Sequence, residues 1–131
     1  MTPQEFLEPG YKLAYSLLRD EESFPPFVVV LGDSGRPACV MPEDGSVNTV
    51  KAEIRRRAVQ ASLELAALFT MGRALFEGES EQRLVVSVHL DAPGLNRLIL
   101  TPYALTDGNL SLGTPLIMTA SEALIPRAPS A

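Results

Sequence analysis

Apolar positions near the N-terminus predict a first helix. Residues 2–5, Thr-Pro-Gln-Glu, place a hydroxyl N-cap, a proline at the first helical position and a glutamate at the third, which is a capping box. Tyr11 and Tyr15 follow on one stripe at helical spacing. We expect this helix to end near Arg19, with either a kink or a second helix start at Pro9.

The longest periodic pattern covers residues 48–76. Apolar side chains recur there at steps of three and four, a second apolar stripe lies beside them, and polar side chains gather in the first half. The pattern predicts one long helix with Asn48 as its N-cap. Because this helix would end apolar on nearly all sides, we expect it to lie at the centre of the domain or in a subunit interface.

Two short apolar runs between these helices predict a β-hairpin. Residues 27–31 are apolar on both faces and rich in β-branched side chains, which is typical of a buried strand. After a turn at 32–35, residues 38–41 form the return strand. Pro37 and Pro42 bracket that strand and place it towards an edge of the sheet.

The last third of the chain predicts an antiparallel meander. Residues 84–90 alternate between apolar and polar, 97–101 return after a turn, and shorter apolar runs follow at 110–112 and 116–118. Residues 119–122 repeat the capping-box pattern and predict one short helical turn.

The predicted fold class is therefore α+β, in the order α-β-β-α-β-β-β with a short C-terminal helix in addition. An antiparallel sheet of about five strands carries a long central helix and an N-terminal helix. We expect a single domain over residues 1–125 and a flexible tail over 126–131.

This order of elements is similar in layout to the roadblock/longin-like group of small α/β-sandwich modules. In that group helices cover a central antiparallel sheet, and homodimers form through a helix or an edge strand. The similarity lies in element order alone, so it assigns no functional residue to this chain.

Composition removes several classes of protein. The chain has 131 residues, 46% of them hydrophobic, and a net charge of -5, so one hydrophobic core suffices without a metal or a disulfide. Its one cysteine, Cys39, and one histidine, His89, cannot build a structural zinc site. We therefore predict no metal and no cofactor.

Charge and hydropathy argue against two classes of partner, nucleic acids and membranes. The only basic cluster is Arg55, Arg56 and Arg57, which is too little for a nucleic-acid surface. No apolar run approaches the roughly 18 residues that span a bilayer, and the N-terminus lacks the apolar core of a signal peptide. We expect a cytoplasmic protein that binds neither nucleic acid nor membrane.

Residues 32–35, Gly-Asp-Ser-Gly, resemble the nucleophile motif of chymotrypsin-like serine proteases. The resemblance covers only these few residues, and Arg36 stands where that family has a further glycine. The only histidine follows Ser34 in the chain, whereas in that family it precedes the serine. A hairpin turn accounts for the same string of residues.

His89 and Asp91 are the other weak candidates for catalysis. They alternate onto one face of a strand, about 7 Å apart by strand rise, which is too far for a direct hydrogen bond. Ser34, His89 and Asp91 could act together only if the two hairpins met edge to edge. Otherwise they are polar side chains on the outer face of the sheet.

The three arginines are a weak candidate for a binding site. Consecutive helical residues are about 100° apart, so Arg55, Arg56 and Arg57 fan out over about 200° of the helix. Glu53 lies four residues before Arg57, which favours a solvated helix face. Recognition of a partner is the alternative.

Together these observations favour a non-enzymatic binding or adaptor domain. We expect it to be a homodimer that associates through the apolar surface of helix 48–76 or through a sheet edge, with a further protein partner as an option. Two alternatives remain: a small hydrolase that uses Ser34 and His89, and a small-ligand sensor with a pocket between helix and sheet.

Overall fold

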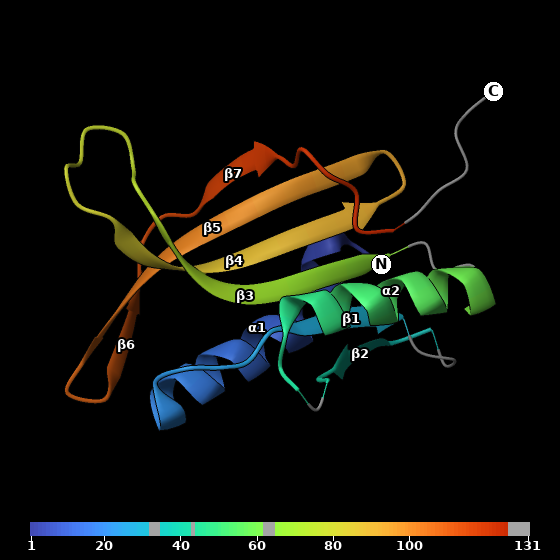
Figure 1. The fold of residues 1–131 in the computed structure, drawn as a ribbon. Helices are drawn as coiled ribbons and strands as arrows, with labels where there is room; N and C mark the ends of the chain where they lie inside the picture. The colour runs from blue at the N-terminus through green and yellow to red at the C-terminus, as the bar shows by residue number, and fades with distance from the viewer. Residues whose placement is uncertain (32–34, 43, 62–64, 126–131) are drawn as a thin grey trace.

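The computed structural model describes residues 1–31, 35–42, 44–61 and 65–125. In chain order its elements are α1 (Pro3–Glu21), β1 (Phe27–Leu31), β2 (Pro37–Val40), α2 (Val47–Ala61), β3 (Ala66–Ala74), β4 (Arg83–Ala92), β5 (Leu95–Thr106), β6 (Asn109–Leu112) and β7 (Leu116–Thr119). The strands form one open antiparallel sheet in the order β2-β1-β3-β4-β5-β6, and β7 also pairs with β5 (Figure 1). The α+β class and the antiparallel sheet are confirmed, with seven strands in the described residues where we expected about five.

Helix α1 begins as predicted and runs further than predicted. The backbone N–H of Glu5 donates to Thr2 Oγ1 at 3.1 Å, which is the expected N-cap. The helix continues through Pro9 and ends at Glu21, and Glu22 follows in a left-handed conformation with φ 63°. Because Gly10 has no side chain, α1 lies close against Phe69 of the sheet.

The single long helix predicted over 48–76 is wrong. Helix α2 ends at Ala61, and Ala66–Ala74 forms β3 between β1 and β4. The first four residues of β3 are buried, so apolar side chains occupy consecutive positions and match helical spacing as well as a strand. The N-cap of α2 is Ser46 instead of Asn48, since Ser46 Oγ accepts the backbone N–H of Thr49 at 3.1 Å.

The two helices cover opposite faces of the sheet. Alternate residues of β1 separate two cores: Phe27 and Val29 pack on the α1 side, and Val28 and Val30 on the α2 side. The α1 core is the larger and contains a stacked pair of rings, Phe27 and Phe69, with centroids 4.9 Å apart. The molecule therefore has three layers, helix, sheet and helix.

The C-terminal third is built around the long strand β5. The register of β5 moves by one residue between its partners β6 and β7, and Gly113 lies between them. The helical turn predicted over 119–122 does not form, because Thr119 ends β7 and the backbone N–H of Ala120 donates to the carbonyl of Asn96 at 3.0 Å. The predicted tail, 126–131, lies outside the described residues.

The predicted edge position of β2 is confirmed, since β2 pairs with β1 alone. Of the helices that the structure describes, neither combines the length and the apolar surface needed to cross a bilayer.

Candidate functional site

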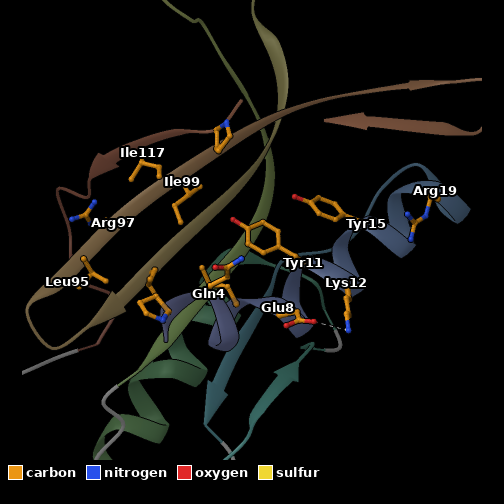
Figure 2. A pocket seen from close by; sticks show the side chains of 14 residues that line it. Gln4, Glu8, Tyr11, Lys12, Tyr15, Arg19, Leu95, Arg97, Ile99 and Ile117 are labelled. Atoms are coloured by element: carbon orange, nitrogen blue, oxygen red, sulfur yellow. Dashed lines mark ion pairs between the residues drawn. The ribbon is translucent and has the colours of Figure 1, made fainter. Parts of the chain in front are cut away.

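A groove of about 1120 Å³ lies between α1 and the part of the sheet that α1 leaves uncovered. One wall is a stripe of α1, and the other is formed by β5 and by the start of β7 (Figure 2). Leu95, Arg97 and Ile99 alternate along β5 and so present their side chains to the same face of the sheet as α1. Ile117 of β7 pairs with Ile99 and extends that wall to the sheet edge.

Two tyrosines of α1 form the aromatic part of the groove. The rings of Tyr11 and Tyr15 are stacked with centroids 5.5 Å apart, and Tyr11 also meets the edge of Phe69 at 5.3 Å. Figure 2 shows both tyrosines projecting from α1 towards the strand that carries Ile99. Their spacing of four residues puts them on one helix face, which the sequence had already indicated.

Burial extends the pH range over which the two phenol groups stay protonated. It raises the pKa of Tyr11 to about 12, with a further rise from neighbouring Tyr15, while a hydrogen bond with the Thr101 side chain acts in the opposite direction. Burial also raises the pKa of Tyr15, and Thr101 again opposes the shift. At neutral pH both phenols are therefore neutral groups that can donate or accept a hydrogen bond.

Charged side chains stand at the rim of the groove. Lys12 is paired with Glu8 at 3.1 Å. Arg19 and Arg97 also line the groove, and neither has an ion-pair partner within the described part of the chain. In Figure 2, Arg97 lies at one end of the groove, by Leu95 and Ile117, and Arg19 lies at the other end.

The lining is suited to binding. Its described residues include one carboxylate, that of Glu8, and no histidine, cysteine or serine. Apolar walls with a few polar groups at the rim are typical of small-molecule sites.

Two of the three catalytic candidates, His89 and Asp91, lie on the opposite face of the sheet. His89 Nε2 is 2.7 Å from Asn96 Oδ1, and Asp91 Oδ2 accepts the backbone N–H groups of Leu124 and Ile125 at 2.8 and 2.9 Å. The structure thus gives His89 and Asp91 different partners, and the buried Asp91 fastens the C-terminal segment to the sheet. The third candidate, Ser34, lies outside the described residues.

The arginines of α2 also lie on that face. Arg56 and Arg57 both bind the carboxylate of Glu53, Arg57 through Nε at 2.9 Å, and hydrogen bonding from Arg56 lowers the pKa of Glu53 to about 2. Arg55 borders a small cavity of about 60 Å³ together with His89. The three side chains thus have different surroundings. No group of three or more metal-ligating side chains occurs in the described ranges.

The sequence left open a pocket between helix and sheet, but it did not locate this groove. The tyrosine stripe was visible, but Arg97 and Ile117 become its neighbours only through the order of strands in the sheet. Comparison with protein-family models, with curated proteins and with solved structures finds no match for this chain.

Proposed function

We propose that this protein is a non-enzymatic binding domain whose ligand occupies the groove between α1 and β5. The observation that carries the proposal is the groove itself: about 1120 Å³, apolar walls, and polar groups confined to the rim and to the two phenols. A ligand there would bury apolar surface on both sides, at roughly 25 cal/mol for each Å² removed from water. Of the three functions that the sequence left open, this combines the binding domain with the small-ligand sensor.

Two neighbouring residues of β7 allow a direct test. Ile117 lines the groove, whereas Met118 alternates to the other face of the strand, and their exposed fractions are similar, 53% and 40%. The neutral fluorophore N-phenyl-1-naphthylamine, which brightens in apolar surroundings, serves as the probe. We expect Ile117→Asp to weaken its binding about tenfold, because a carboxylate would have to be desolvated beneath it.

Met118→Asp is the matched control, with the same charge on the same strand, and should bind the probe within about twofold of the parent protein. If the parent protein does not bind the probe, or if both variants bind it equally, the groove is not the binding site.

We also propose that the protein self-associates through the free edge of β7. Leu116, Ile117 and Met118 are exposed there, and the strand carries neither a proline nor a charged residue. Prolines and charged residues are two of the devices by which proteins protect exposed edges from pairing. A second copy would pair antiparallel with β7 about a two-fold axis, so that the same strand serves both partners.

The apolar surface on the α2 side of the sheet also favours the β7 edge as the dimer interface. Leu98 and Leu100 of β5 pair with Met118 and Leu116, which carries apolar side chains from the sheet out to its edge. The other predicted interface, the end of helix 48–76, loses its basis because residues 66–74 form a central strand. Light scattering tests the proposal: we expect a dimer that Ile117→Asp and Met118→Asp both convert to a monomer, so the two variants differ only at the groove. A monomeric parent protein at high micromolar concentration would contradict it.

A further inference from the structure

We propose that the ligand of the groove is an elongated apolar molecule with one anionic group, and that Arg97 binds this group. The inference rests on the proposed function, because it names the class of ligand for the same site.

The shape of the groove favours an elongated ligand. Its lining runs along α1 from Pro3 to Arg19, which is most of the length of the helix, and the tyrosine pair lies between the two ends (Figure 2). The opposite wall is a row of aliphatic side chains from β5 and β7. A flexible chain could therefore lie between aromatic rings on one side and aliphatic groups on the other.

The charges favour an anion. The groove is lined by three cations, Lys12, Arg19 and Arg97, and one anion, Glu8, in a protein whose net charge is -5. Glu8 neutralises Lys12 at 3.1 Å, so the two arginines carry the net positive charge of the lining. A negative group on the ligand would be attracted to this rim and a positive group repelled.

Arg97 is better placed than Arg19 to hold the anion. It projects from a strand, between Leu95 and Ile99 on the same face, and the pairing of β5 with both β4 and β7 fixes its backbone beside the groove. Its planar guanidinium can donate two parallel hydrogen bonds to a carboxylate or a similar oxyanion. An anion held there would leave the apolar part of the ligand directed towards the tyrosines.

The tyrosines add no competing negative charge. A phenol with its ordinary pKa of 10.0 is already neutral at physiological pH, and burial raises the pKa of both tyrosines further, so they can donate hydrogen bonds to ligand oxygens. The groove thus has a neutral interior and a cationic rim.

Three ligands with the same chain test the inference: octanoate, octanol and octyltrimethylammonium, each displacing N-phenyl-1-naphthylamine from the whole 131-residue chain. We expect octanoate to bind about tenfold more tightly than octanol, and the ammonium compound to bind more weakly than either, since a hydrogen-bonded charge is worth about that factor. Arg97→Ala should reduce the affinity for octanoate to that for octanol and leave octanol within about twofold.

Arg55→Ala is the matched control, since Arg55 lies on the other side of the sheet; it should change none of the three affinities. Thermal unfolding checks that each variant is folded. If Arg97→Ala does not fold, Arg97→Gln replaces it in the same test. Equal affinities for octanoate and octanol, or octanoate binding that survives the loss of Arg97, would overturn the inference while the groove remains a binding site. Failure of the probe and of all three ligands to bind would instead remove the proposed function.

Discussion

Substitution of Gly10 by alanine tests whether α1 is held against the sheet as closely as the structure indicates. A Cβ at this position would lie 2.4 and 2.5 Å from two ring atoms of Phe69 and 2.8 Å from Val29 Cγ2. Ordinary contacts begin at 3.4 Å, so the helix and the ring would have to separate by about 1 Å. Phe69 cannot turn away easily, because its ring is stacked on Phe27 and touched at the edge by Tyr11.

The expected cost follows from two opposing effects. Overpacking in a core costs about 1–3 kcal/mol, and three short contacts place Gly10→Ala at the upper end of that range. Alanine recovers about 1 kcal/mol through its higher helix propensity. The free energy of unfolding should therefore fall by about 2 kcal/mol, which lowers the urea midpoint by about 1 M for a typical slope of about 2 kcal/mol per M.

Gly72→Ala is the control for the same chemical change. Gly72 lies in β3 of the same sheet, and a Cβ there would have Val85 Cγ2 as its nearest neighbour at 3.9 Å, an ordinary contact. This variant should be as stable as the parent protein or slightly more stable, since alanine restricts the unfolded chain. A Gly10→Ala protein at least as stable as the parent would refute the close contact between α1 and Phe69.

Three further predictions concern ionisable groups. Asp91→Ala should lower the free energy of unfolding by about 3 kcal/mol, because two backbone N–H groups would lose their acceptor at a buried site; urea denaturation measures it, and a loss below about 1 kcal/mol would count against this role. Glu53→Gln should destabilise the protein above pH 4.5, because the pKa of Glu53 is lowered from 4.5 to about 2 in the folded state. The difference in unfolding free energy between variant and parent should shrink as the pH falls towards 2. A difference in unfolding free energy that does not depend on pH would contradict the ion pair. In a titration followed by tyrosinate absorbance, Tyr11→Phe should remove a step near pH 12. The parent protein should also lose stability as the pH rises from 10 towards 12. A step that remains near pH 12 in the variant would show that Tyr11 is not the group responsible.

Local signals in the sequence located most elements of the fold. The N-cap at Thr2, the buried run at 27–31 and the prolines at the two ends of the β2 segment each act through neighbouring residues, so each could be interpreted without knowledge of the rest of the chain. The meander after residue 83 was predicted for the same reason, since its strands pair with close neighbours in sequence.

The main error, residues 66–74, had a physical cause. This segment contains alanine, leucine and methionine, which favour helices when isolated. It forms a strand because β1 and β4 pair with it from both sides. Phe69, for example, lies opposite Phe27 of β1 and opposite Val88 of β4. Pairing across the sheet outweighed the local preference, and only the tertiary structure contains that information.

The groove shows the same limit for function. The stripe of Tyr11 and Tyr15 was interpreted as part of the helical pattern, and the residues that face it come from two other regions of the chain, around Ile99 and Ile117. Which strand lies beside α1 depends on the strand order, and the spacing of residues along the chain does not encode that order.

The strand order also indicates two parts of the molecule that we expect to fold at different times. From β3 to β6 each strand pairs with the next one in sequence, whereas β1 reaches β3 only after the chain has passed through β2 and α2. Closing that longer loop costs more entropy, so we expect the C-terminal meander to assemble first and the segment from α1 to α2 to dock onto it later. Tyr11 belongs to the docking segment and Ile99 to the meander. A ligand in the groove would therefore contact both parts and stabilise the interface that forms last.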